Sequence, residues 1–196
     1  MKTSLPIKMI FVVSHFLGLS LNNSLLAQSL YKLTGKPELK VQGGSTIHDW
    51  EMVSAQSNGK AELILAGTTV KHVKSANVTM KTESLKSGKN KMDNIAYDAL
   101  NTKNYPEILF TLTNFKSLGG KKGQATGNLT IAGTTRPVTF NVETTVKGSS
   151  VFLTGETNIK FSDFKISPPT AMLGTVKTSN ELKLLFKVNF MQVAAI

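Results

Sequence analysis

A change of hydrophobic period within residues 84–115 constrains the fold of this chain more than any other feature. Before Pro106, apolar residues recur at helical spacing and form one face of a short helix over residues 90–100. The residues of this face are Met92, Ile95, Ala96, Ala99 and Leu100. Asn90 is expected to cap the helix, and Asp93 lies in its first turn. After Pro106 the period becomes two, which predicts that a strand follows the helix.

The rest of the chain reads as β-structure with Gly-rich turns. Alternation predicts strands over residues 30–34, 38–42, 46–54, 62–66, 77–82, 107–115, 127–132, 138–144, 151–161 and 182–190. The last strand alternates most regularly, with Leu184 and Phe186 on its apolar face and Lys183 and Lys187 opposite. Strands at this spacing predict a mainly β fold, either an antiparallel sandwich or a barrel.

The first 27 residues are predicted to be a secretory signal peptide. Lys2 and Lys8 precede an apolar run over residues 9–21, and Leu25, Leu26 and Ala27 suit cleavage after Ala27. Residues 28–196 then form one domain of ordinary size. The sequence has no cysteine, so this domain contains no disulfide. The expected location is outside the cytoplasm, in the periplasm.

Charge suggests a basic surface without a nucleic-acid site. The formal net charge is +11, but only Arg136 among the 23 basic residues is an arginine, the residue suited to bidentate contacts with phosphates and bases. The lysines are spread over several loops and strands, which disfavours nucleic-acid binding. Lysine-rich loops leave one alternative function, an electrostatic adaptor for anionic envelope polymer or lipid headgroups.

Residue patterns for catalysis or metal binding are almost absent. After the predicted signal peptide, His48 and His72 are the only histidines, and metal, P-loop and dinucleotide motifs are missing. In a strand, Asp49 would point away from His48, whereas Trp50 would share the face of His48. His48 is therefore expected to be structural or to contact a ligand at a cavity mouth. An enzyme acting on a lipid, with His48 as base, is the remaining catalytic alternative.

Two groups of apolar residues leave their role open at this point. The inward faces of the strands carry aromatic and aliphatic residues that could fill a core or line one slender cavity, and periodicity does not separate the two. Met172 and Leu173 lie in a Pro-containing loop over residues 167–178, where apolar residues would meet a partner, a lid, a lipid or the neighbouring strand.

The order of several short motifs resembles the YceI-like family of exported lipid-binding proteins. The motifs are Ser84–Gly88, Met92-Asp93, Asn104–Phe110, Gly127–Val138 and Asp163–Ile166, followed by the closing strand. STIHDWEM and PPTAMLGTVKT are similar to the Bacteroidetes-type branch. The resemblance implies a lipocalin-like antiparallel β-barrel of about eight strands with a short helix covering one end. It also implies an apolar cavity for a long-chain amphiphile such as a polyisoprenoid, an isoprenoid quinone or a fatty amide.

The combined expectation is non-catalytic binding, storage or transport of a long-chain lipid. The expected cavity lining is Trp50, Met80, Phe110, Leu112, Leu129, Ile131, Phe140, Val142, Phe161, Leu184 and Phe186. The expected mouth or lid residues are His48, Met92, Ile95, Met172 and Leu173. No metal and no cofactor other than a bound lipid are expected, and the envelope membrane surface is a further candidate partner. The oligomeric state, including a dimer, stays open.

Overall fold

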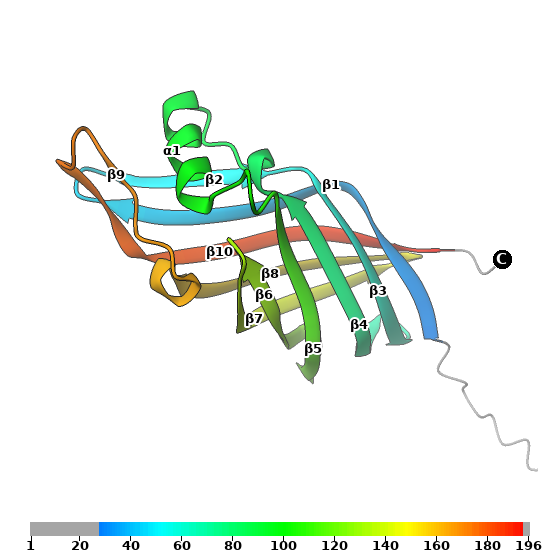
Figure 1. The fold of residues 1–196 in the computed structure, drawn as a ribbon. Coiled ribbons are helices and arrows are strands. Elements are labelled where there is room, and N and C mark those ends of the chain that lie inside the picture. Colours follow the sequence, from blue (N-terminus) through cyan, green and yellow to red (C-terminus); the bar gives the residue numbers. More distant parts are fainter. Residues whose placement is uncertain (1–27, 194–196) are drawn as a thin grey trace, which may run out of the picture.

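The computed structural model describes residues 28–193, so the predicted signal peptide lies outside the described residues. Its strands are β1 (Gln28–Ser45), β2 (Asp49–Ser54), β3 (Ser57–Ala66), β4 (Thr69–Lys81), β5 (Glu107–Gly119), β6 (Lys122–Ile131), β7 (Thr134–Lys147), β8 (Ser150–Lys160), β9 (Thr170–Ala171) and β10 (Val176–Gln192) (Figure 1). The helix α1 spans Asn90–Leu100, and two short 3₁₀ helices, η1 (Thr82–Ser84) and η2 (Phe161–Phe164), complete the fold.

Eight of these strands close into an antiparallel barrel. The order around it is β1, β3, β4, β5, β6, β7, β8 and β10, and pairing of β10 with β1 closes the ring. Tight turns that contain glycine join four of the eight neighbouring pairs: β3–β4, β5–β6, β6–β7 and β7–β8. The mainly β fold and the barrel of eight strands are therefore confirmed, and residues 28–193 contain one short α-helix, as predicted.

Strand β1 is longer than the sequence predicts, because it pairs with two different strands along one of its edges. Residues 28–32 pair with β3, residues 39–44 pair with β2, and β10 pairs along the other edge. The two expected strands are one, because Gly35, at φ +75°, absorbs an irregularity without ending the pairing with β10. As Figure 1 shows, β1, β2 and β10 reach past β5–β7 at one end of the barrel, below α1.

The predicted helix bounds are confirmed, but the predicted cap is wrong. Lys89 is the N-cap and makes no side-chain capping bond, so Asn90 is the first helical residue. The helix ends at Asn101, whose left-handed conformation (φ 51°) directs its N–H to the carbonyl oxygens of Tyr97 and Asp98. Asparagine tolerates this conformation better than most residues, which explains the position of the end.

Several strand ends also differ from the prediction. Residues 46–48 form a bend instead of the start of a strand, because the Ser45 hydroxyl donates to the His48 carbonyl oxygen at 2.7 Å and accepts the His48 N–H at 3.2 Å. The turn between β6 and β7 is reduced to Ala132 and Gly133, so Pro137 lies within β7. These ends depend on single hydrogen bonds and turn conformations that periodicity does not report.

Candidate ligand cavity

A cavity of about 560 Å³ occupies the barrel and continues beneath α1. Its wall is formed mainly by aliphatic and aromatic side chains from the barrel strands, α1, η2 and the 167–178 loop. Three buried apolar clusters surround it. One lies around Tyr31 and Phe140, a second around Ile159 and Phe164, and the third under α1 around Met52.

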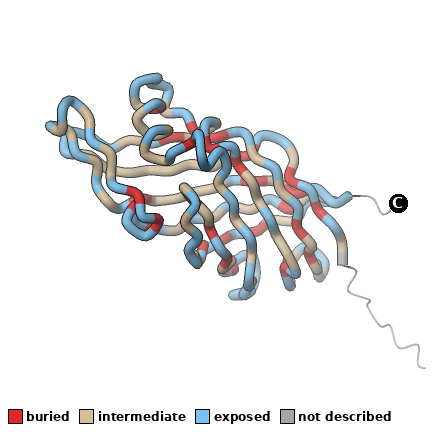
Figure 2. The backbone as a smooth tube through the Cα atoms, viewed as in Figure 1, coloured by how far each residue is buried: buried red, intermediate tan, exposed pale blue. Residues whose placement is uncertain are grey.

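The interior is open rather than filled. Several residues that point inward on their strands are only half-buried, as Figure 2 shows by the intermediate colour along the strands below α1. These residues are Leu39, Val41, Ile108, Phe110, Leu112, Leu184 and Phe186, and all of them line the cavity. Inward-facing side chains in a close-packed core would be buried. The apolar stripe therefore lines a cavity.

Glycines in the barrel wall allow aromatic rings to lie against the strands. Phe186 covers Gly155, its direct partner on β8, and Phe110 covers Gly127 on β6. Phe140 lies between the two rings, at centroid distances of 5.6 Å from Phe110 and 5.4 Å from Phe186, in edge-to-face contacts. The rings thus cover bare backbone, and this placement leaves space beside them. Sequence reasoning missed this pairing, for which interior strand glycines are the available signal.

Helix α1 covers the cavity with its whole apolar face. The five residues that gave the helical period all line the cavity. The helix packs on Met52, Met80 and Leu85, and Val53 of β2 bridges to Lys86 in the loop that leads to the helix. Ala99 and Leu100 also pack against the second cluster, and polar contacts add to these. The Tyr97 hydroxyl lies 2.8 Å from the carbonyl oxygens of both Glu83 and Leu85, to which it donates.

A buried carboxylate fastens the start of α1 to the preceding loop. Asp93 accepts hydrogen bonds from the Ser87 N–H at 2.8 Å and the Ser87 hydroxyl at 2.6 Å, and Lys86 Nζ lies 4.0 Å away. Burial opposes ionisation, but these hydrogen bonds and the lysine charge outweigh it and hold the pKa of Asp93 below its usual value. Sequence reasoning placed Asp93 at the helix dipole and missed this contact.

We expect Asp93→Ala to destabilise the protein by about 1–3 kcal/mol, because it leaves the Ser87 N–H without its acceptor. Since the pKa is lower in the folded state, the contribution of Asp93 is fully present above the unfolded pKa of about 3.9 and is lost as pH falls through the folded pKa. Urea unfolding of both proteins across this range measures it. Asp98→Ala, on an exposed position of α1, is the control. An advantage of the wild type that persists in strong acid would contradict this role.

The structure brings nearly all predicted site residues to one cavity. All eleven predicted lining residues lie along its wall, together with His48, Met92, Ile95 and Met172. Leu173 does not line the cavity, because it is fully exposed at the tip of the β9–β10 hairpin. Sequence reasoning missed lining residues of β1, Leu39 and Val41, although their alternation carried the signal.

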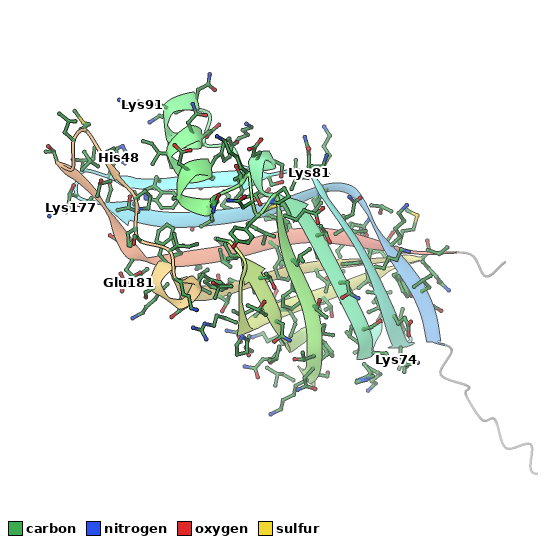
Figure 3. The ribbon with its side chains drawn as sticks, viewed as in Figure 1. His48, Lys74, Lys81, Lys91, Lys177 and Glu181 are labelled. Atoms are coloured by element: carbon green, nitrogen blue, oxygen red, sulfur yellow. The ribbon has the colours of Figure 1, made fainter. Side chains whose placement is uncertain are left out.

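Within residues 28–193, no group of three or more histidine, aspartate or glutamate residues could hold a metal ion. His48 is exposed at the mouth (Figure 3), and its side chain has no hydrogen-bond or ion-pair partner among these residues. In the same part of the chain, no helix is long and apolar enough to cross a membrane.

Comparisons with known proteins agree with this architecture. BcnA of Burkholderia cenocepacia superposes with a TM-score of 0.65 at 21% identity, over 78% of this chain and 95% of that one. A polyisoprenoid binding domain from Saccharophagus degradans, implicated in plant cell wall breakdown, gives a TM-score of 0.61 at 12% identity, over 83% and 98%. At these identities the likeness concerns the fold.

Sequence relatives are found in bacteria. A UPF0312 protein of Pseudomonas putida (strain F1) is 34% identical over 107 residues, 50% of this chain and 56% of that protein. Protein YceI of Escherichia coli O6:H1 is 32% identical over 124 residues, 59% of this chain and 62% of that protein. The chain thus spans little more than half the length of these relatives. The family described as YceI-like domain matches over residues 38–190, and the chain therefore belongs to the YceI-like family.

Proposed function

We propose that this protein binds a long-chain apolar lipid in its barrel, for storage or transport and without chemical change to the lipid. The observation that carries the proposal is the open apolar cavity of about 560 Å³. This volume lies within the range typical of small-molecule sites. Each methylene that leaves water for such a wall contributes about 0.8 kcal/mol. The tail would therefore supply most of the affinity, and the headgroup would remain at the mouth.

The similar fold of a polyisoprenoid binding domain supports a polyisoprenoid as the ligand type, and the long apolar cavity would equally accept an isoprenoid quinone or a fatty amide. Binding is favoured over catalysis because His48, the residue that an enzyme would use, lacks an orienting partner within residues 28–193. Export to the periplasm through residues 1–27 is part of the same proposal, since a water-exposed lipid needs a carrier between membranes.

The test is native mass spectrometry of protein purified from its own host, followed by organic extraction. A mass excess that extraction removes, and that contains a long-chain lipid, is the expected result. Titration gives a second measurement, because Trp50 is the only tryptophan and lines the cavity, so that a quinone ligand should quench its fluorescence. Protein that carries no lipid and binds no polyprenol, quinone or fatty amide would contradict the proposal.

The lid role of α1 leads to a separate prediction. Ile95→Asp places a carboxylate against the apolar cavity. Keeping this carboxylate hydrated or charged in apolar surroundings costs free energy, which destabilises the closed position of the helix. We expect lipid to be released about tenfold faster or more, while the strands keep their stability. The loss of apolar contact equivalent to two buried methylenes is enough to change the rate by that factor. Stopped-flow transfer of lipid to acceptor vesicles measures the rate. Asn94→Asp, exposed on the same helix, adds the same charge as a control, and equal rates in all three proteins would exclude a lid.

A further inference from the structure

Three large apolar side chains lie exposed together at the mouth of the cavity. They are Ile47, Met172 and Leu173, which we call the tip, and 63%, 67% and 108% of their surfaces are exposed. The two loops that carry them are joined, because the Thr46 N–H donates to the Lys177 carbonyl oxygen at 3.0 Å and Ala171 pairs with Val176. Ile47 and Met172 also line the cavity. Such a patch marks an interaction surface.

The backbone of the tip gives a second, independent observation. Met172 and Leu173 both have left-handed backbones, at φ 53° and 56°, and the Gly174 N–H donates to the Ala171 carbonyl oxygen at 3.1 Å. This is a type I′ turn, which favours asparagine and glycine. In the left-handed conformation of its two central residues, a Cβ atom lies too close to the following carbonyl oxygen. Two bulky apolar residues thus occupy positions where the backbone conformation is unfavourable for them and where their side chains are exposed to water. A role for the side chains themselves explains this choice.

Three lysines lie at the same end of the molecule as the tip. Lys89 and Lys91 line the cavity mouth, and Lys177 extends from the hairpin beside the tip. Figure 3 shows Lys91, His48 and Lys177 at the same end of the molecule, far from Lys74. Acids lie nearby as well: Asp49 is exposed beside His48, and Glu51, Asp163 and Glu181 line the adjoining groove, where Glu181 pairs with Lys160. Apolar side chains flanked by lysines match a bilayer with anionic headgroups. The apolar side chains can insert into such a bilayer while the lysines contact its phosphates.

We propose that the tip docks this protein onto the anionic surface of a lipid bilayer. Docking would place the cavity mouth against the bilayer, so that a lipid could pass into the barrel without crossing water. The purpose of docking rests on the proposed lipid function, but the binding itself does not. A second copy of this chain would also cover an apolar patch, but it would bring Lys89, Lys91 and Lys177 against the same three lysines, which is less favourable than an anionic surface.

The experiment is sedimentation with vesicles of phosphatidylcholine alone or mixed with phosphatidylglycerol. The wild type should bind only the mixed vesicles and should dissociate as salt increases. Leu173→Gly should weaken binding roughly tenfold or more, because it removes an inserted side chain. Lys177→Gln should weaken binding roughly fivefold. Glycine suits the left-handed position, so the loss would not be a folding defect, and thermal unfolding checks this.

Leu118→Gly is the matched control, because Leu118 is also an exposed leucine next to lysines but lies at the opposite end of β5 from the helix. Equal losses for Leu173→Gly and Leu118→Gly would overturn the proposal. So would a wild type that carries lipid yet ignores mixed vesicles, a result that leaves the proposed function intact. If Leu173→Gly instead converts a dimer to a monomer without affecting vesicle binding, the tip is a self-association surface. Vesicle binding by a protein that holds no lipid would support docking and contradict the lipid function.

Discussion

Leu184→Trp is expected to abolish lipid loading while the barrel still folds. Leu184 lies midway along β10, points inward and is half-buried. It packs against both large apolar clusters of the barrel, so an indole there would divide the cavity. Each buried methylene contributes about 0.8 kcal/mol. A lipid chain that loses the burial of only two methylenes would therefore bind about tenfold more weakly. A chain excluded from half of the cavity should lose much more.

The stability of this variant separates an open cavity from a core. Overpacking a filled core costs about 1–3 kcal/mol, whereas an indole that enters open space should cost less. Mass spectrometry with organic extraction measures lipid content, and urea unfolding measures stability. Lys187→Trp is the control, since Lys187 is exposed on the outer face of the same strand. A Leu184→Trp protein that loads lipid normally would show that the chain does not occupy this part of the barrel.

Local pattern was enough to predict the helix, the alternating strands and the residues that face inward. The helix bounds were predicted correctly because five apolar residues at helical spacing are followed closely by Pro106. Inward and outward residues on β5 and β10 were also predicted correctly, since neighbouring side chains on a strand point to opposite faces. These features depend on residues close together in the sequence. The resemblance to a known family supplied the closed barrel.

Features that depend on distant residues could not be predicted in this way. Periodicity shows that Ile131 and Leu184 both point inward, but not that Ile131 is buried in a cluster with Phe164 and Ile166 while Leu184, at the edge of that cluster, stays half-buried. The contact of Asp93 with Ser87 depends on how the loop before α1 folds back. Likewise, no local pattern reports that β1 pairs with both β2 and β3.

The glycines within the strands show most clearly how a position can depend on distant residues, and they lead to a second prediction with a large expected effect. A Cβ added at Gly155 would lie 2.5 Å from the Phe186 ring and 3.0 Å from Val142, both of them side-chain atoms. A Cβ added at Gly127 would lie 2.5 Å from the Phe110 ring and also 2.5 Å from the backbone oxygen of Thr111. A ring can turn into the open cavity, but the backbone of a paired strand cannot move without breaking its hydrogen bonds.

The two substitutions should therefore fail in different ways. We expect Gly155→Ala to fold with a loss of about 1–3 kcal/mol and to bind lipid poorly, because the Phe186 ring would be displaced into the cavity. Gly127→Ala should lose more than about 4 kcal/mol or not fold, since the β5–β6 pairing must open. Unfolding and lipid content of both proteins test this difference. Adding Phe186→Leu to Gly155→Ala should restore lipid binding by removing the displaced ring. If the double variant binds no better than Gly155→Ala, the ring is not what fills the cavity, and the glycine is required for the geometry of β8 itself.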